Sequence, residues 1–148
     1  MARVSGGAQL RPRKVVLLVD GDAERLGMRR LLLENQAHVR VVPCGSAEDM
    51  LVMLKAGLRV DLMITQWRLP GLSGNDLCAL AAQVDPMMNR LLLDEGRDCV
   101  PDSSWAHRWL GSKASIRDLL DAVRVLVQRK RGPTTGAAVR AARDRETA

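Results

Sequence analysis

The stretch VDLMITQWRLPGLSG, from Val60 to Gly74, decides the fold. Its first half, residues 60–65, is a short apolar run that favours a strand buried inside a sheet. Gln66 follows directly, and the Pro70-Gly71 pair then predicts a loop. The sequence therefore places an amide side chain where a buried strand passes into a loop.

Outward from this stretch, short apolar runs alternate with segments of helical periodicity. We predict strands at 14–20, 38–43, 60–65, 89–93 and 107–110, and helices at 22–35, 46–57, 76–84 and from 115 to shortly before Gly132. Strands that alternate with helices form right-handed βαβ units and a parallel sheet covered on both faces. The predicted fold class is α/β, a flavodoxin-like, doubly wound five-stranded parallel sheet with strand order 2-1-3-4-5.

Functional residues of such folds gather at the carboxyl ends of the strands, near the point where the strand order reverses. In this chain those ends carry Asp20, Thr65 with Gln66, Asp94, and the residues after Leu110. The topology alone selects these positions as the candidate site.

Residues 14–130 resemble response-regulator receiver domains of two-component signalling. The most specific matches are the strand end LVD at 18–20 and the loop WRLPGLSG at 67–74. In that family the third strand ends in an aspartate that accepts a phosphoryl group. Here that position holds Gln66, and a carboxamide is not a nucleophile that forms an acyl phosphate. The resemblance thus implies a degenerate receiver, or pseudo-receiver, with no catalytic residue.

The resemblance also implies a magnesium site built on paired acids after the first strand. Asp20 matches the first acid, Gly21 stands at the second, and Asp22 follows where it can cap the next helix. Asp94 falls where the family has a serine or threonine that meets the phosphoryl oxygen, and a carboxylate there repels a phosphoryl group. A one-residue shift would instead make Asp94 a loop acid. We expect a remnant acidic pocket, weak magnesium binding through Asp20 at most, and no cofactor.

Two further positions of the family follow the fifth strand. Trp109 falls at the position of the switch aromatic residue. Without a gap Ser112 takes the position of the family's lysine, and Lys113 comes one residue late, so the sequence leaves both open. Lys113 is a candidate counter-ion for the acids, or else a solvated surface lysine.

The segment 95–104 contains Pro101 and is a poor helix former, so we predict a shortened or irregular fourth helix. Trp105 and Trp109 flank it, and exposed tryptophans are common anchors of protein interfaces. We therefore regard them as a candidate partner surface. The alternative is that both rings are buried in the core.

The chain has 148 residues and a formal net charge of +6. Its excess positive charge lies at the two ends, which leaves residues 15–128 at about −2. The cysteines Cys44, Cys78 and Cys99 are odd in number and widely spaced, which fits neither a zinc site nor a disulfide framework. We expect a cytoplasmic protein with a flexible basic arm at 1–13, a receiver-like domain at 14–130, and a flexible basic tail at 131–148.

The sequence favours a non-catalytic module that binds a protein partner without phosphorylation. The expected partner is a histidine kinase, another receiver or a regulator, and a homodimer is compatible with the sequence. One alternative is weak, sequence-independent nucleic-acid association through the basic ends. Another is a sensor of pH or of a small anion that uses the acidic pocket. We expect neither enzymatic activity nor membrane insertion.

Overall fold

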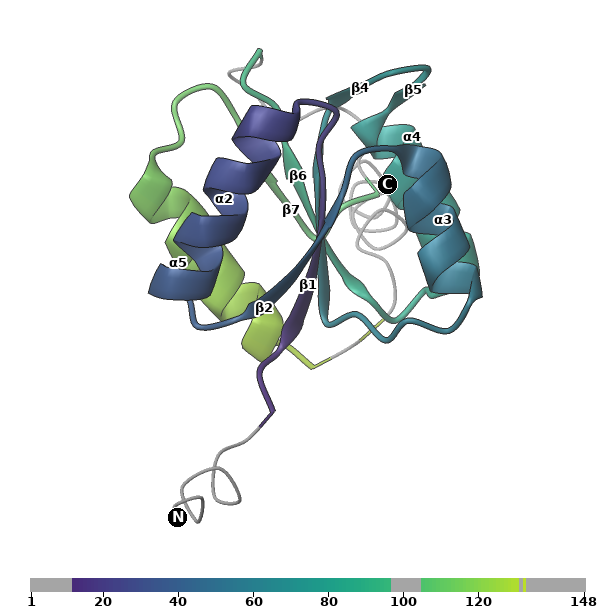
Figure 1. The fold of residues 1–148 in the computed structure, drawn as a ribbon, viewed down its shortest axis with the longest axis horizontal. Coiled ribbons are helices and arrows are strands. Elements are labelled where there is room, and N and C mark those ends of the chain that lie inside the picture. The colour runs from purple at the N-terminus through teal and green to yellow at the C-terminus, as the bar shows by residue number, and fades with distance from the viewer. Residues whose placement is uncertain (1–11, 97–104, 131, 133–148) are drawn as a thin grey trace, which may run out of the picture.

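Five parallel strands form the central sheet in the order β2-β1-β3-β6-β7 (Figure 1). The computed structural model describes residues 12–96, 105–130 and 132. The strands of this sheet are Val15–Val19 (β1), Arg40–Cys44 (β2), Leu62–Gln66 (β3), Asn89–Leu93 (β6) and Arg108–Leu110 (β7). Since β6 and β7 are its fourth and fifth strands, the predicted flavodoxin-like order 2-1-3-4-5 is confirmed.

The central strands form because most of their side chains are apolar and nearly all are buried on one face or the other. The parallel register places Val19 of β1 beside Thr65 of β3, and Gln66 beside Leu93 of β6. The carboxyl ends of the three inner strands therefore lie at nearly the same level. β3 begins two residues later than predicted and ends one residue later, so that Gln66 is the last residue of the strand.

Four helices within the described residues cover the sheet: Ala23–Gln36 (α2), Ala47–Lys55 (α3), Gly74–Val84 (α4) and Ile116–Gln128 (α5). Each begins after a polar residue whose side chain accepts a hydrogen bond from the backbone N–H three residues on. These caps are Asp22, Ser46, Ser73 and Ser115. Such a cap stabilises a helix by about 1 kcal/mol, and it fixes where the chain turns from strand to helix.

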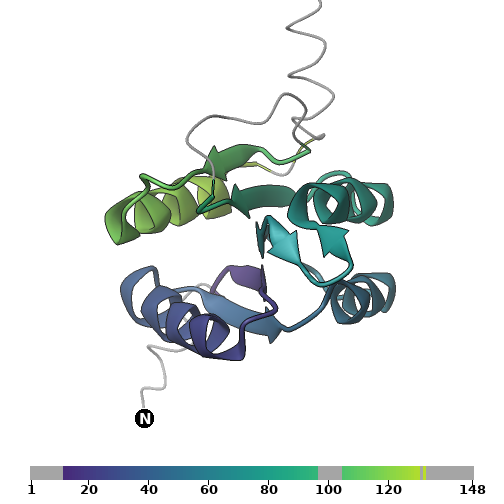
Figure 2. The same ribbon diagram turned by 90° about the horizontal axis from the view of Figure 1, so that it is seen from above.

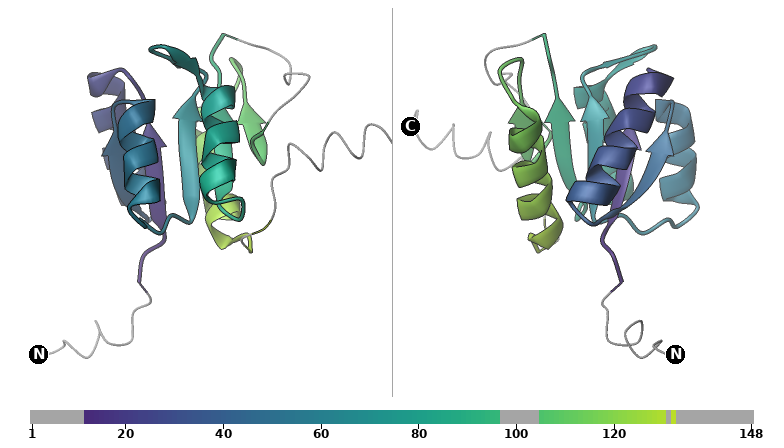
Figure 3. Two further views of the ribbon diagram at one scale, coloured as in Figure 1. Left: turned by 90° about the vertical axis from the view of Figure 1, so that its right-hand side faces the viewer. Right: turned by 60° about the vertical axis from the view of Figure 1, so that its left-hand side comes forward.

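The helices lie in two layers. Seen from above, α2 and α5 cover one face of the sheet, and α3 and α4 cover the other (Figure 2). One apolar cluster joins the strands to Leu33 of α2 and to Leu119 and Val123 of α5. A second joins them to Met50 of α3 and Leu77 of α4. Figure 3 shows the layer of α3 and α4 facing the viewer in its left panel and the layer of α2 and α5 brought forward in its right panel.

A two-stranded antiparallel hairpin, Arg68–Leu69 (β4) and Leu72–Ser73 (β5), replaces the plain loop expected after β3. It turns at Gly71, whose φ of 75° suits glycine. The hairpin brings Gly74 so close to the strand end that an added Cβ would lie 2.0 Å from the carbonyl oxygen of Gln66. Only glycine at position 74 lets α4 begin against Gln66.

Several expectations lie outside the described residues. They are the flexible arm at 1–13, apart from residues 12 and 13, most of the tail at 131–148, and the irregular fourth helix, which falls on 97–104. Within the described part of the chain, no helix is both long and apolar enough to cross a membrane.

Candidate functional site

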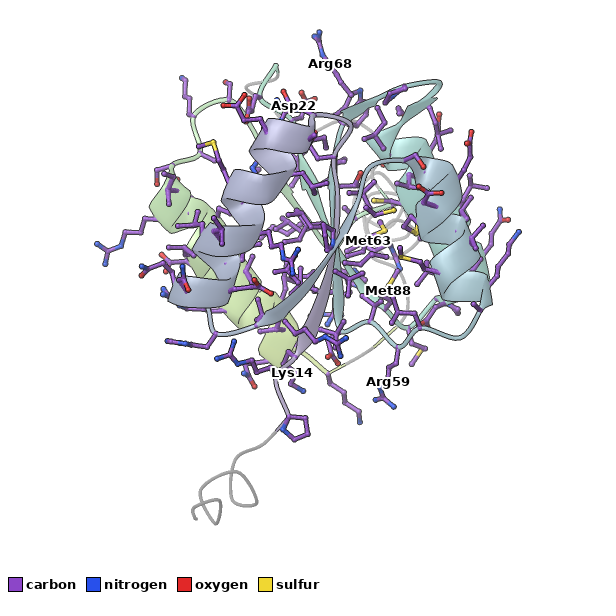
Figure 4. All side chains as sticks on the ribbon, in the orientation of Figure 1. Lys14, Asp22, Arg59, Met63, Arg68 and Met88 are labelled. Atoms are coloured by element: carbon purple, nitrogen blue, oxygen red, sulfur yellow. The ribbon has the colours of Figure 1, made fainter. Side chains whose placement is uncertain are left out.

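Three polar side chains meet where the inner strands end. Asp20 follows β1, Gln66 ends β3 and Asp94 follows β6, and these three strands are neighbours in the sheet. All three residues are buried, with exposed fractions of 0%, 5% and 3%. The topology therefore brings together these three of the residues that the sequence selected. Figure 4 shows the same end of the molecule, where Asp22 and Arg68 are labelled.

Asp20 is held by two arginines of α2. Arg25 donates from Nε to Oδ2 at 2.6 Å and from Nη2 to Oδ1 at 2.8 Å, which makes a two-point ion pair. Arg29 donates from Nη1 to Oδ2 at 3.3 Å. The backbone N–H of Asp22 donates to Oδ1 at 2.9 Å. Each carboxylate oxygen of Asp20 thus accepts two hydrogen bonds.

The same arginines contact Gln66. Hydrogen bonding assigns its amide so that Nε2 donates to the carbonyl oxygen of Leu93 at 3.0 Å. Its Oε1 then accepts from Arg25 Nε and from Arg29 Nη2, each at 3.2 Å, and also from Arg29 Nη1. The amide therefore joins β3 to β6 with its nitrogen and binds two guanidinium groups with its oxygen.

The charge state of Asp20 follows from these contacts. Burial acts to raise its pKa, but the hydrogen bonds from Arg25 and Asp22 and the charges of Arg25 and Arg29 outweigh burial. The pKa of Asp20 consequently lies below its ordinary value, and the carboxylate stays ionised at neutral pH. Burial lowers the pKa of Arg29, although an arginine remains protonated under all physiological conditions.

Arg29 also reaches the loop after β6. Its Nη2 donates to Glu95 Oε1 at 2.8 Å, while Asp94 Oδ1 accepts from the backbone N–H of Gly96 at 3.0 Å. One guanidinium group therefore links α2, the end of β1, the end of β3 and the β6 loop. A cavity of about 330 Å³ lies beside Gln66, lined by Arg25, Gln66, Trp67, Arg68, Asp94, Glu95 and Gly96.

Several known structures with this fold are receiver domains. A signal receiver domain of an HD domain-containing protein from Pseudomonas fluorescens Pf-5 is 26% identical over 81% of this chain and 90% of its own, with a TM-score of 0.70. A putative response regulator from Chloroflexus aurantiacus J-10-fl is 25% identical over 80% of this chain and 100% of its own, with a TM-score of 0.69. This chain has the receiver-domain fold.

A response regulator receiver domain protein from Methanospirillum hungatei JF-1 agrees in fold, with a TM-score of 0.69 at 21% identity over 78% of this chain and 94% of its own. No protein-family model matches the sequence, and neither does any curated protein. The comparisons therefore rest on structure, and they extend over the described body of the chain.

Gly21, which the resemblance aligns with the family's second acid, lies close to Pro70. A Cβ added to Gly21 would lie 3.0 Å from Cδ and 3.4 Å from Cγ of Pro70. The proline ring of the β4–β5 turn would have to move by a few tenths of an ångström to admit a Cβ at position 21. Asp22 is exposed, and its carboxylate caps α2 by accepting from the N–H of Arg25 at 3.0 Å.

The residues after β7 lie apart from this cluster. Ser112 and Lys113 are both exposed on the turn before α5, and neither lines the cavity beside Gln66. The cations that neutralise Asp20 come instead from α2. Which of the two residues corresponds to the family's lysine stays a prediction.

All three tryptophans are half-buried and pack on the α3–α4 side of the sheet. The backbone of Trp105 is fixed at both ends: its N–H donates to Asn75 Oδ1 at 2.9 Å, and its carbonyl accepts from Arg90 Nε at 2.8 Å. Trp109 lies on the edge strand β7 and packs against the apolar cluster between the sheet and the helices α3 and α4. Each of these residues keeps part of its surface exposed, and the partner surface at Trp105 and Trp109 remains a prediction.

The residues of the site do not fit magnesium. This ion requires a near-octahedral set of oxygen ligands, mostly carboxylates and water. Both oxygens of Asp20 are taken by guanidinium and amide donors, and position 21 supplies no ligand. Among the residues that the structure describes, no group of three or more His, Cys, Asp or Glu side chains is arranged to hold a metal.

Sequence reasoning missed Arg25 and Arg29. Both follow the strand end on the first two turns of α2, four residues apart, and residues at this spacing share one helix face. Two arginines at that spacing directly after a buried acid are a usable signal. It indicates a built-in counter-ion where the family would bind a metal.

Proposed function

We propose that this protein is a pseudo-receiver: a phosphorylation-independent protein-interaction module of two-component-type signalling. It would pass information by docking to a protein partner and carry out no phosphoryl transfer. The observation that supports this most strongly is the shared binding of Asp20 and Gln66 by Arg25 and Arg29.

The chemistry of this cluster opposes phosphorylation at two points. Gln66 supplies an amide where an acyl phosphate would require a carboxylate nucleophile. Next to it lie the guanidinium groups of two arginines. These groups belong to the chain and stay protonated, whereas a bound metal ion can exchange with the solution. A receiver built in this way stays in one state, whatever phosphodonor is present.

The cluster also supports a fixed conformation. Arg29 ties α2 to Glu95 in the loop after β6, and Gln66 ties β3 to β6. In the receiver fold these segments surround the site, so their cross-linking by side chains would present a constant surface to a partner. We include the exposed parts of Trp105 and Trp109 in that surface. A histidine kinase, another receiver or a regulator would be its partner.

The lowered pKa of Asp20 argues against a proton sensor. A group that senses pH near neutrality must titrate there. The pKa of Asp20 instead lies below its ordinary value, so this carboxylate is already ionised at neutral pH. Nucleic-acid binding through the basic ends would be sensitive to salt and independent of sequence. Deleting residues 1–13 and 131–148 separates that idea from docking, since docking by the body should survive the deletion.

The test is intact-mass spectrometry of the purified protein after incubation with acetyl phosphate and magnesium, together with its tryptophan emission in beryllofluoride and magnesium. We expect no adduct on the wild-type chain, and unchanged tryptophan emission. A conventional receiver domain treated in parallel is the positive control. Stoichiometric, acid-stable but base-labile phosphorylation of the wild-type chain would refute the proposal.

A further inference from the structure

The two ends of the sheet differ in charge. At the carboxyl ends of the strands, the first turn of each of the helices α2, α3, α4 and α5 holds at least one acid. At the opposite end, where the strands begin and the helices finish, exposed cations gather. We call this end the basic pole, and it is defined by Lys14, Arg40, Lys55, Arg59, Arg129 and Lys130.

The basic pole contains a row of cations across three neighbouring strands. Lys14 directly precedes β1, Arg40 is the first residue of β2, and Arg59 lies three residues before β3. The backbone N–H of Arg40 donates to the carbonyl oxygen of Lys14 at 2.9 Å. Since adjacent strands lie about 4.8 Å apart, the three strands span about 10 Å. Lys14 and Arg59 are seen at the opposite end of the molecule from Asp22 and Arg68 (Figure 4).

The helix dipole does not account for this row. The dipole stabilises cations at the carboxyl end of a helix, which explains Lys55 on α3 and Arg129 after α5. A β-sheet has only a small dipole, and Lys14, Arg40 and Arg59 stand at or before the starts of strands. Within residues 12–96, 105–130 and 132, none of these three side chains forms an ion pair. Their charges therefore face solvent without a partner among the described residues.

The acids near the basic pole are engaged by the chain itself. Asp61 Oδ2 accepts from the first backbone N–H of β1 at 2.8 Å, and Asp85 Oδ1 accepts from the backbone N–H of Met87 at 3.2 Å. Glu34 pairs with Arg30 at 3.4 Å. These carboxylates are bonded locally, whereas the cations of the basic pole are exposed. The surface at this end is consequently positive.

Both basic ends of the chain adjoin this pole. Residue 12, the first that the structure describes, lies just before β1, and the N–H of Gly132 donates to the carbonyl oxygen of Met87 at 3.0 Å, in the loop before β6. Residues 1–14 carry four basic groups and no acid, and residues 129–148 carry six basic groups and two acids. The excess positive charge of the chain is therefore attached to the end of the body that is itself positive.

The aromatic residues indicate which polyanion fits this surface. Clustered cations are the electrostatic footprint of a phosphate backbone. Single strands are held by stacking their bases on exposed aromatic rings. This chain has no Tyr or Phe, and its three tryptophans are half-buried against the apolar cluster beside α3 and α4. Trp and Tyr are also the usual anchors at a membrane interface. A duplex, which is held through its phosphates alone, is favoured.

We infer that the basic pole of this protein binds the phosphate backbone of duplex nucleic acid, independently of sequence. Lys14, Arg40 and Arg59 contact phosphates, and the basic chain ends add to the attraction. Such contacts release counterions, so the affinity falls steeply as the salt concentration rises. The inference goes beyond the proposed function and does not rest on it, because Asp20 and Gln66 lie at the opposite end of the sheet.

The test is fluorescence anisotropy of the full chain with short labelled DNA duplexes of two unrelated sequences, over a series of salt concentrations. We expect equal affinity for both sequences and a linear fall of log affinity with log salt concentration. Arg40→Glu and Arg59→Glu, on different strands, should each weaken binding at least about fivefold and reduce the salt slope by about 1. Far-UV circular dichroism should show that both variants stay folded.

The matched control is Arg117→Glu, which makes the same change of charge on an exposed residue in the first turn of α5, at the carboxyl end of the sheet. It should change the affinity by less than about twofold, because salt screens distant charges. Equal weakening by all three variants would overturn the inference, since net charge alone would then explain binding. So would unchanged affinity in Arg40→Glu and Arg59→Glu, no duplex binding at low salt, a strong preference for one sequence, or tighter binding to vesicles of anionic phospholipid.

Discussion

Arg25 of α2 donates two hydrogen bonds to Asp20 at the end of β1, from Nε at 2.6 Å and from Nη2 at 2.8 Å. The carboxylate is fully buried, whereas the guanidinium side chain is 37% exposed. This pair neutralises the buried acid that follows β1. We propose that this cation of the protein's own takes the place of an exchangeable metal ion.

Removing the carboxylate should destabilise the fold. Asp20→Ala leaves Arg25 and Arg29 without their buried partner. We expect a loss of about 2 to 4 kcal/mol in the free energy of unfolding, and not more, because the Arg25 side chain remains partly exposed to solvent. Asp121→Ala is the control, because its pair with Arg124 is exposed on both sides and should contribute less than about 1 kcal/mol. Urea unfolding of both variants checks the difference. Equal losses would contradict the role of Asp20.

The stabilisation by Asp20 should depend on pH in one direction. Its folded pKa lies below the ordinary value of 3.8, so the unfolded state takes up a proton first as the pH falls. The free-energy advantage of wild type over Asp20→Asn should be full well above pH 3.8 and should shrink below it. Unfolding curves at several pH values measure this advantage. An advantage that grows toward acid pH would reverse the assigned sign.

Restoring the nucleophile alone should not restore phosphorylation. Gln66→Asp places a carboxylate between Arg25 and Arg29, where it forms ion pairs, while Gly21 and Asp94 remain unchanged. We expect no labelling by acetyl phosphate in intact-mass spectra. Gln66→Asn serves as the control for shortening the side chain. Robust labelling of Gln66→Asp would show that the neighbouring positions matter less than their geometry indicates.

Gly74 should tolerate no side chain. A Cβ there would lie 2.0 Å from the carbonyl oxygen and 2.7 Å from the carbonyl carbon of Gln66, both backbone atoms. Gly74→Ala should cost about 3 kcal/mol or more, because α4 must shift away from β3. Gly45→Ala is the matched control, since its Cβ would meet nothing within 4 Å. Thermal unfolding of the two variants should differ clearly, and similar melting temperatures would contradict the close approach.

Two cysteines should be unreactive in the folded protein. Cys44 and Cys78 are free and buried; burial raises the pKa of Cys44 and raises that of Cys78 to about 12. In a Cys99→Ser variant, a thiol reagent at mildly alkaline pH should react only after denaturant is added. The denatured sample, which should release two thiols, is the internal control. Rapid reaction without denaturant would mean that one thiol is accessible.

The architecture could be predicted from the sequence because its signals are local. Buried strands such as 60–65 are continuous apolar runs, and Asp22, Ser46 and Ser115 mark the helix starts that the structure has. The parallel order then follows from alternation. The position of Gln66 at a strand end could be predicted once the end of this one strand was located.

The contacts of the site could not be predicted in the same way. The reach of Arg25 and Arg29 to Asp20 depends on how α2 packs over the sheet, which is a tertiary property. Arg90 shows the same limit. Its residue type predicts an exposed position, but on β6 it is fully buried and donates to the backbone carbonyls of Trp105 and Met88.

The most direct measurement is a crystal structure of the wild-type protein grown or soaked with magnesium and beryllofluoride. We predict that Arg25 and Arg29 keep their contacts with Asp20 and Gln66, and that neither ion binds at the strand ends. Magnesium on Asp20 with the arginines turned away, or beryllofluoride seated beside Gln66, would contradict the central claim.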